Sequence, residues 1–435
     1  MSVTVAIVGT GPAGFYTAEA LLRKGLDCTI DLIDRLPTPY GLIRFGVAPD
    51  HQTTKKVTRN FEKTALNERC RFFGNVTLGR DLTLDELRGM YDAVVLAVGA
   101  DNDRRLGIPG EDKRGVIGSA TFVGWYNAHP DLRDLAPVLD TPAAVIIGNG
   151  NVAIDVARVL VKTAAEMAES DLPEFAARAI QASPIRDVYL AGRRGPVEAK
   201  FTNVELREMG HLDVAQAVVD AKDLPDAVGA VEDDRDRRLK EKNLATLREF
   251  AAQPAGGKTR RVHFLFYASP VEILGGERVE GVRFERTKLD GDRVVGTGQT
   301  FDIACGLVIP AIGYRSLPVD GAPFDNRKDI VVNDEGRVGP GLYAVGWLRR
   351  GPSGVIATNR PDGVAVAGHI AADIPAGAKP GRAALEKHLA ARGVRVVSFG
   401  DWQAIERAEI AAAQAPAPRR KFERVSDMLA LLERS

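Results

Sequence analysis

The chain has 435 residues, of which 45% are hydrophobic and 27% charged, and its 58 basic side chains balance 58 acidic ones. This length and composition are typical of a globular protein with roughly two or three domains. A net charge of zero argues against nucleic acid as a partner, and the lack of an apolar run of about 18 residues argues against a membrane span.

The first residues lead directly into a predicted strand, without the basic and apolar regions of a signal peptide. We therefore expect the fold to begin at residue 3. The three cysteines, Cys28, Cys70 and Cys305, are too widely spaced for a CxxC pair or an iron–sulfur site. These features predict a cytoplasmic protein without a metal site, whose redox chemistry comes from a bound organic cofactor.

The N-terminal segment contains a glycine-rich loop between a predicted strand and a predicted helix. Residues 3–8 are β-branched and apolar, as in a buried parallel strand, and a helical pattern follows Gly14. Gly9 allows a tight turn, Gly11 allows close approach of a pyrophosphate, and Gly14 allows the helix to pack on the strand. The loop reads Gly9-Thr-Gly11-Pro12-Ala13-Gly14, the GxGxxG pattern.

An acidic residue stands where such a unit needs one. A second predicted strand, residues 28–33, ends at Asp34, which follows Gly14 by 20 residues. That is the spacing of an acid that binds a ribose hydroxyl. We interpret the strand, loop, helix and acid together as a dinucleotide site, and the alternative is a glycine-rich turn without a ligand.

A second unit of the same kind follows the buried strand predicted at residues 143–147. Its loop has the GxGxxA pattern, with alanine at the position that packs helix on strand. A helical pattern continues from Ile154. The loop reads Gly148-Asn-Gly150-Asn151-Val152-Ala153.

The residues after the next predicted strand, 187–191, distinguish the second unit from the first. Arg193 and Arg194 stand there instead of the acid typical of an NAD site. Two guanidinium groups suit a 2′-phosphate, which they can bind with paired hydrogen bonds. The alternative is a solvated arginine pair, and the inserted residues 162–184 lengthen the usual spacing. The pattern favours NADP(H).

Two dinucleotide units in one chain are typical of hydride transfer between a nicotinamide and a flavin. We expect FAD at the first unit and NADP(H) at the second. The predicted fold class is α/β, with two Rossmann-like dinucleotide-binding domains, the NADP(H) domain being inserted into a discontinuous FAD domain. The FAD domain comprises residues 1–100 and 311–435, and the NADP(H) domain residues 101–310. Apolar strands predicted at 91–100 and 305–313 mark the two crossings.

Three further segments carry structural predictions. Short alternating strands at 262–267 and 279–285 predict an antiparallel meander attached to the NADP(H) domain. A helix is predicted to start after Gly354, and Pro361 with Gly363 predicts its break near residue 360. Its N-terminus either faces the flavin, where its dipole would stabilise negative charge, or only packs on the sheet. A short C-terminal helix is predicted from about Ser426.

The chain resembles the adrenodoxin-reductase-type ferredoxin–NADP+ reductases. The bacterial branch without a fused ferredoxin domain fits best, because neither a cysteine cluster nor a leader is present. The similarity is collinear over most of the chain and includes residues 39–51, 72–76, 148–158, 192–196, 201–208 and 345–356.

The resemblance implies which residues contact each of the two cofactors. FAD is expected to contact Gly9, Gly11, Pro12, Ala13, Gly14, Asp34, Leu42, Val76, Trp347, Gly354, Val355 and Ile356. NADP(H) is expected to contact Asn151, Val152, Ala153, Ile154, Arg193, Arg194 and Glu205, together with Arg105 or its neighbour Arg104. Asp34 replaces the glutamate that is commoner in the family, which shortens the reach of the acid and keeps its acceptor.

Three residues are expected to act in catalysis. His51 can titrate near neutral pH and move protons at the flavin, and Asp155 stands one helical turn beyond Asn151, so it can face the same site. Glu208 is either part of a proton path or a surface charge, whereas Glu205 is expected to anchor the nicotinamide amide. The alternatives for His51 and Asp155 are a merely hydrogen-bonded loop histidine and a solvated helical acid.

The resemblance implies an acidic ferredoxin as redox partner, and a basic docking surface is then expected. Residues 235–242 are one candidate, although acids are interleaved, and Lys55, Lys56 and Arg59 are another. Either run can also be an ordinary solvated helix face.

The expected activity is electron transfer from NADPH through FAD to a ferredoxin, first as hydride and then as single electrons. Alternatives are an FAD/NADPH monooxygenase and the electron-input subunit of a glutamate-synthase-like complex. No sequence feature indicates an organic substrate pocket for the former, and the N-terminal cysteine clusters of the latter are missing.

Overall fold

The computed structural model describes residues 2–254 and 256–434, and the chain divides into two compact units. Unit 1 comprises Met1–Asn102, Asn127–Arg133 and Tyr314–Ser435, and unit 2 comprises Asp103–Tyr126 and Asp134–Gly313. The chain passes between the units after residues 102, 126, 133 and 313. The sequence did not indicate that Asn127–Arg133 returns to unit 1.

Unit 1 is built on a six-stranded sheet in the order β17-β18-β4-β1-β2-β3. All neighbours pair in parallel except β17, which is antiparallel to β18. Side chains alternate along β1, so that Val5 and Ile7 enter one core cluster and Ala6 and Val8 another. The sheet is therefore buried on both faces, as its continuous apolar run predicts. The strands are β1 (Val3–Val8), β2 (Cys28–Ile33), β3 (Cys70–Phe73), β4 (Ala93–Leu96), β17 (Arg337–Gly339) and β18 (Leu342–Ala344).

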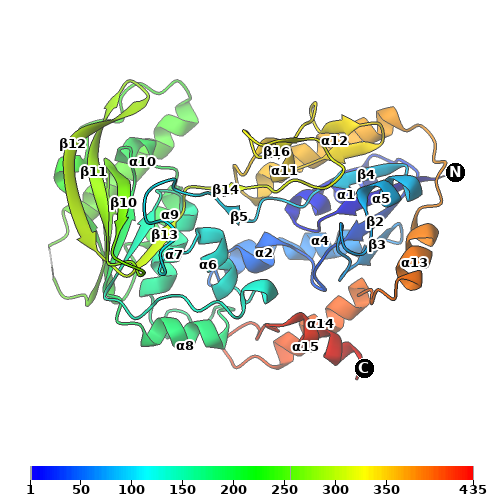
Figure 1. The fold of residues 1–435 in the computed structure, drawn as a ribbon, viewed down its shortest axis with the longest axis horizontal. Coiled ribbons are helices and arrows are strands. Elements are labelled where there is room, and N and C mark those ends of the chain that lie inside the picture. The colour runs from blue at the N-terminus through cyan, green and yellow to red at the C-terminus, as the bar shows by residue number, and fades with distance from the viewer. Residues whose placement is uncertain (1, 255, 435) are drawn as a thin grey trace. The chain divides into compact units, whose positions relative to one another are not determined.

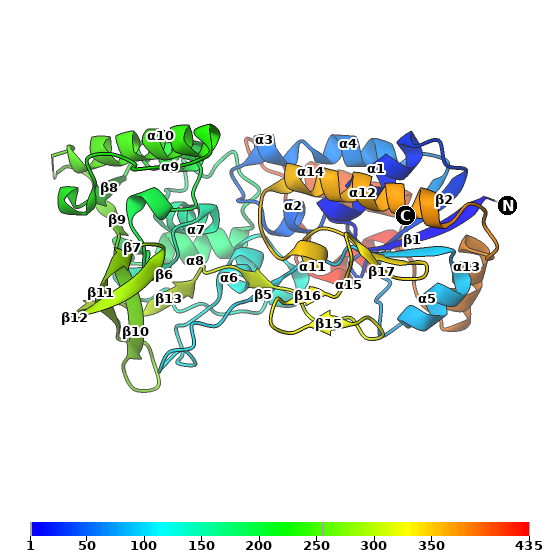
Figure 2. The ribbon, with the colours of Figure 1, turned by 90° about the horizontal axis from the view of Figure 1, so that it is seen from above.

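Helices cover this sheet, and α1 packs along α12 on one face (Figure 2). The helices of unit 1 are α1 (Pro12–Arg23), α2 (Leu42–Phe45), α3 (Gln52–Lys55), α4 (Thr58–Ala65), α5 (Leu84–Met90), α11 (Trp347–Arg350), α12 (Asn359–Asp373), α13 (Arg382–Ala391), α14 (Phe399–Ala411) and α15 (Val425–Leu432), with 3-10 turns at Pro130–Leu132 and Ile356–Thr358. Small pairs are formed by β15 (Phe324–Asp325) with β16 (Ile330–Val331), and β14 (Tyr314–Arg315) with β5 (Asn102–Asp103).

Unit 2 has a five-stranded, wholly parallel sheet in the order β13-β6-β7-β9-β8. Beside it lies an antiparallel sheet in which β11 stands between β10 and β12 (Figure 1). The strands are β6 (Ala143–Ile147), β7 (Asp187–Ala191), β8 (Ala215–Val219), β9 (Arg260–Leu265), β10 (Ala268–Leu274), β11 (Gly281–Asp290), β12 (Arg293–Ala304) and β13 (Leu307–Pro310). The helices are α6 (Ser119–Tyr126), α7 (Asn151–Val161), α8 (Glu174–Ala182), α9 (Asn203–Glu208) and α10 (Asp234–Ala251), with 3-10 turns at Pro196–Glu198 and Ala221–Asp223.

The α/β fold class with two parallel, Rossmann-type sheets is confirmed, and the strands at 3–8, 28–33, 143–147 and 187–191 have the predicted bounds. None of the helices within the described residues is both long and apolar enough to cross a membrane.

Two predictions were wrong in detail. The strand predicted at 262–267 to begin the meander is β9, which pairs in parallel with β7 and β8. The 18-residue helix α10 separates β8 from β9, and a connection of that length allows a parallel crossover.

The second concerns the helix after Gly354. A 3-10 turn, Ile356–Thr358, precedes α12, which starts at Asn359 instead of breaking near 360. Pro361 falls in the first helical turn, where a missing N–H breaks no hydrogen bond.

A buried ion pair fastens the C-terminal helices of unit 1 to its N-terminal half. The Arg44 and Glu409 side chains are 4% and 0% exposed and bind each other in bidentate fashion, with 3.0 Å between Arg44 Nη1 and Glu409 Oε2. The guanidinium also lies 5.1 Å from the centre of the Trp402 ring. Lys421 Nζ donates to the Arg44 carbonyl at 3.1 Å and to the Asn127 carbonyl at 3.3 Å. This cluster therefore also holds the start of the returning segment Asn127–Arg133.

We expect Glu409→Gln to lower the free energy of unfolding of unit 1 by about 3–5 kcal/mol, because Arg44 would stay buried without its counter-charge. Urea denaturation followed by circular dichroism measures this. Glu433→Gln is the matched control, since Glu433 is 63% exposed beside Arg395, and its expected cost is less than about 1 kcal/mol. Equal costs for the two variants would contradict the prediction.

Candidate functional site

The glycine loop of unit 1 joins β1 to α1 through contacts that exclude side chains. Gly9 has φ +102°, and a Cβ there would lie 2.4 Å from the carbonyl oxygen of Ala97. A Cβ on Gly14 would lie 2.1 Å from the carbonyl oxygen of Gly9. Both glycines are therefore required for the helix to start directly behind the strand.

Gly11 has the opposite environment. Its φ is −75°, and no atom lies within 4 Å of the place of a Cβ. It is the N-cap of α1, and no side chain among the described residues caps that helix. The first N–H groups of a helix have no partner within the helix, so this open space suits a phosphate group.

Asp34 lies beside the loop at the end of β2. Its carboxylate accepts hydrogen bonds from the backbone N–H groups of Thr10 and Leu36, each at 3.0 Å, and from the Thr10 hydroxyl. Burial raises the pKa of Asp34, while these hydrogen bonds act to lower it. A carboxylate has about four acceptor positions, so these bonds leave capacity for a ribose hydroxyl. Val76 lies next to Asp34, because its N–H donates to the Asp34 carbonyl at 2.9 Å.

Two further segments of unit 1 lie against the loop. The Tyr40 N–H donates to the Thr10 carbonyl at 2.9 Å, and a Cβ on Gly41 would lie 3.1 Å from Gly11 Cα. A Cβ on Gly346 would lie 2.6 Å from Ala13 Cβ. The structure thus brings the residues that follow, Leu42 and Trp347, next to the loop, although they stand far apart in the sequence.

The segment at Gly354 is tied to the same place. Trp347 Nε1 donates to the carbonyl of Ser353 at 3.0 Å, and the Thr358 hydroxyl donates to the carbonyl of Val355 at 2.6 Å. The following helix α12 lies close against α1, because a Cβ on Gly363 would be 2.7 Å from backbone atoms of Tyr16 and Thr17. The residues predicted from the resemblance to contact FAD are therefore all near the first loop or near a segment bound to it.

The loop of unit 2 repeats the arrangement of unit 1. Gly148 has φ +143°, and a Cβ there would lie 2.3 Å from the carbonyl oxygen of Ala311. Gly150 has open space around the place of its Cβ and is the N-cap of α7, again without a side-chain cap among the described residues. The second loop therefore also offers uncapped N–H groups to an anion.

The arginine pair follows β7 and lies beside this second loop. A Cβ on Gly192 would lie 1.9 Å from Asn149 Nδ2, so the two loops touch at that point. Arg193 is exposed and Arg194 half-buried. Arg105 forms ion pairs through Nε with Glu111 at 2.9 Å and through Nη2 with Asp112 at 2.6 Å.

Two of the predicted catalytic carboxylates are held by one arginine that the sequence analysis missed. Arg158 is 1% exposed and lies 2.8 Å from Asp155 Oδ1 and 3.2 Å from Glu208 Oε2. Helix α9, which carries Glu208 and Glu205, follows Thr202, whose N–H donates to Asn151 Oδ1 at 2.8 Å. Asp155, Glu208 and the second loop therefore form one cluster in unit 2. The signal for Arg158 was its apolar helix face, on which a charge needs a partner.

The third predicted catalytic residue, His51, belongs to unit 1. It is the half-buried N-cap of the short helix α3, and its N–H donates to the carbonyl of Ala48 at 3.0 Å.

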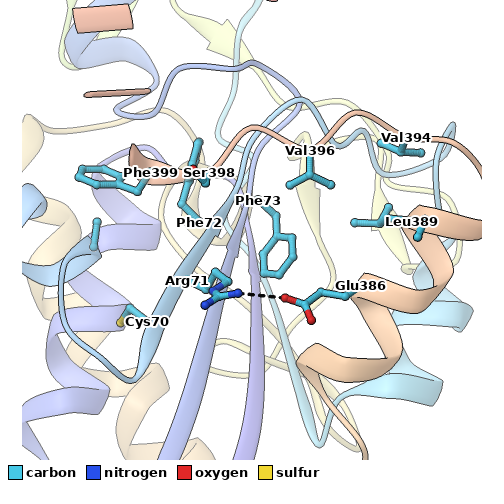
Figure 3. A pocket seen from close by; sticks show the side chains of 12 residues that line it. Cys70, Arg71, Phe72, Phe73, Glu386, Leu389, Val394, Val396, Ser398 and Phe399 are labelled. Carbon is cyan, nitrogen blue, oxygen red and sulfur yellow. Dashed lines mark hydrogen bonds and ion pairs between the residues drawn. The ribbon is translucent and has the colours of Figure 1, made fainter. Parts of the chain in front are cut away.

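Unit 1 also has a hollow of about 510 Å³ at its edge strand β3. Apolar side chains from β3, α13 and residues 394–399 line it (Figure 3). Arg71 and Glu386 form an ion pair there at 3.1 Å. None of the residues predicted to bind a cofactor is among those that line this hollow.

Some of the basic side chains in the two candidate docking runs are buried or paired with acids. Lys55 is only 9% exposed, so the expectation that it presents its charge to a partner was wrong. In α10, Arg237 pairs with Asp234 and Lys240 pairs with Asp236 at 2.9 Å. These pairs reduce the field that an acidic partner would meet, and they are typical of a solvated helix face.

Comparison with known proteins decides the family. The sequence model of the pyridine nucleotide-disulphide oxidoreductase family matches residues 3–187 of this chain. Human mitochondrial NADPH:adrenodoxin oxidoreductase is 43% identical over 98% of this chain and 91% of its own. The chain belongs to the NADPH:adrenodoxin oxidoreductase family. NADPH-ferredoxin reductase FprA of Mycobacterium tuberculosis is 40% identical over 98% of both chains.

The fold agrees with this family over almost its whole length. The solved structure of Mycobacterium tuberculosis FprA in complex with NADPH superposes with a TM-score of 0.93, at 38% identity, over 99% of each chain. The predicted resemblance to the adrenodoxin-reductase-type enzymes is therefore confirmed, and the similarity includes both units.

We expect Gly14→Ala to lower the melting temperature of the ligand-free protein, because the added methyl group would collide with the carbonyl oxygen of Gly9. Gly11→Ala is the matched control in the same loop and is expected to leave that temperature unchanged, since its methyl group meets open space and its φ is ordinary. Differential scanning calorimetry of the apoprotein, after removal of bound flavin, measures both. A Gly11→Ala protein as unstable as the Gly14→Ala protein would contradict the prediction.

Proposed function

We propose that this chain is an NADPH:ferredoxin oxidoreductase, with FAD held by unit 1 and NADP(H) bound by unit 2. The observation that carries the proposal is the pair of uncapped glycine loops, one beside Asp34 and the other beside Arg193 and Arg194. Membership of the NADPH:adrenodoxin oxidoreductase family supports it. When bound, FAD would accept a hydride from NADPH and pass the electrons singly to an iron–sulfur protein.

In unit 1, the chain's task is to bind and orient the flavin nucleotide. The free N–H groups at the start of α1 face the place of the pyrophosphate, which the open space at Gly11 admits. Asp34 accepts from the adenosine ribose. Leu42 and Trp347 come from the two segments packed on the loop, and they border the cofactor from there.

In unit 2, charge selects the nucleotide. The start of α7 binds the second pyrophosphate, and the guanidinium groups of Arg193 and Arg194 bind the 2′-phosphate with charge-assisted hydrogen bonds. Glu205, in α9, anchors the nicotinamide amide.

Proton handling falls to His51, Asp155 and Glu208. The Arg158 guanidinium lies against both carboxylates and orients them. Asp155 and Glu208 would act as proton acceptors, and the imidazole of His51 would exchange a proton at the flavin.

The partner is an acidic ferredoxin-type protein, which matches the partner type in the names of the relatives. A cytoplasmic location is part of the same proposal, and the three free, buried cysteines are compatible with a reducing compartment.

Anaerobic stopped-flow spectroscopy tests the function. The flavin absorbance is expected to bleach on mixing with NADPH and much more slowly with NADH, and subsequent mixing with an oxidised ferredoxin should return it. Ferricyanide is the control acceptor, since it needs no docking. Reduction of ferricyanide without reduction of any ferredoxin would refute the proposed partner, and equal rates with NADPH and NADH would refute the role of the arginine pair.

A further inference from the structure

Hydrogen bonds from outside the parallel sheet hold the backbone of the arginine loop, residues 192–195. They come from the antiparallel sheet of unit 2 and from the turn that precedes it. Each carbonyl group of residues 192–194 accepts a hydrogen bond from the β9–β10 turn, from the start of β10 or from β11. The Gly192 carbonyl accepts from Ala268 N at 2.9 Å and the Arg194 carbonyl from Tyr267 N at 3.1 Å. The Arg193 carbonyl accepts from the Thr287 hydroxyl at 2.8 Å. Only the last of these bonds comes from a side chain.

Thr287 lies beside an irregularity in the pairing of β11 with β12, where the extra residues belong to β12. The pairing of β11 with β12 shifts register between Glu285 and Thr287, and such bulges are often found next to active sites. Thr287 is 8% exposed, and its own N–H donates to the Tyr267 carbonyl at 2.9 Å. Its hydroxyl therefore faces the loop from a rigid, buried position.

The turn that supplies the bond from Tyr267 has an unusual backbone. Tyr267 has φ +52°, a conformation that costs about 1 kcal/mol or more outside glycine and is often kept for function. A Cβ on Gly195 would lie 2.2 Å from the Tyr267 hydroxyl oxygen, so the end of the loop is pressed against this side chain. The position of the loop is thus set from both its ends.

The hairpin between β11 and β12 also reaches a guanidinium group. Arg194 Nη2 donates to the carbonyl of Asp292 at 3.3 Å. The antiparallel sheet therefore orients the side chain of Arg194 in addition to binding the backbone at Arg193.

We propose that Thr287 is a positioning residue for the selection of NADP(H) over NAD(H). The proposal rests on the proposed function, in which Arg193 and Arg194 bind the 2′-phosphate. Arginine side chains lose much conformational freedom on binding, and a fixed backbone removes part of that cost before the ligand arrives. The hydroxyl of Thr287 supplies this preorganisation without touching the nucleotide.

The test compares Thr287→Val, which keeps the shape and removes the hydroxyl, with Thr287→Ser, which keeps the hydroxyl. The probes are adenosine 2′,5′-bisphosphate and 5′-AMP, measured by calorimetry or by competition on the full, flavin-loaded chain. Thr287→Val is expected to raise the Kd of the bisphosphate about three- to tenfold, the effect of one lost hydrogen bond. The Kd of 5′-AMP should change by less than about twofold, and Thr287→Ser should behave like the parent chain.

Thr141→Val is the matched control, because the buried Thr141 hydroxyl also donates to a backbone carbonyl of unit 2, that of Ala143 at the start of β6, at 3.1 Å. It is expected to alter neither affinity. Equal weakening of both probes by Thr287→Val, or no weakening of the bisphosphate, would overturn the role of Thr287. If the parent chain itself does not prefer the bisphosphate, the proposed NADP(H) site fails and the inference fails with it.

Discussion

The structure depends on one constraint, which is that a helix must begin immediately behind the end of a parallel strand with its first N–H groups uncovered. Gly9, Gly14 and Gly148 meet it by lying where any Cβ would collide with a carbonyl oxygen. The closeness they allow brings the strand end and the helix start together. Gly11 and Gly150 then leave the space in front of each helix start open. A phosphate group completes such a site because it supplies the acceptors that the helix lacks.

Sequence-distant segments hold these loops in place. In unit 1, the chain at Gly41 and at Gly346 packs directly on the first loop, and Glu409 secures the helix that follows Gly41 through Arg44. In unit 2, the antiparallel sheet fixes the arginine loop. The glycine motif alone therefore makes a nucleotide site possible. The exact position of each loop is set by residues elsewhere in the chain that belong to no motif.

The sequence predicted what local chemistry dictates. Glycine spacing, the acid at Asp34 and the arginines at 193 and 194 follow from single short segments, and so do the apolar strands. The partner of a strand does not follow from its alternation, which is why the strand now seen as β9 was assigned to the meander. Pro361 was interpreted as a break because its place relative to the helix start was not fixed by the sequence.

Contacts between distant segments do not follow from local sequence patterns. Arg158 bridges Asp155 and Glu208 only because α7 and α9 meet. Lys55 is buried although its neighbours in the sequence are polar. Its place in a basic run therefore did not show that its side chain is exposed. The contact of Thr287 with Arg193 joins residues nearly a hundred positions apart, so no local pattern could indicate it.

We expect one chain to hold two different dinucleotides at two separate loops. Spectrophotometric titration of the purified chain with NADP+, followed by gel filtration, tests this expectation. The protein should be yellow and should retain one FAD per chain while NADP+ binds and exchanges. A colourless chain that cannot be reconstituted with FAD, or one from which excess NADP+ displaces the flavin, would contradict it.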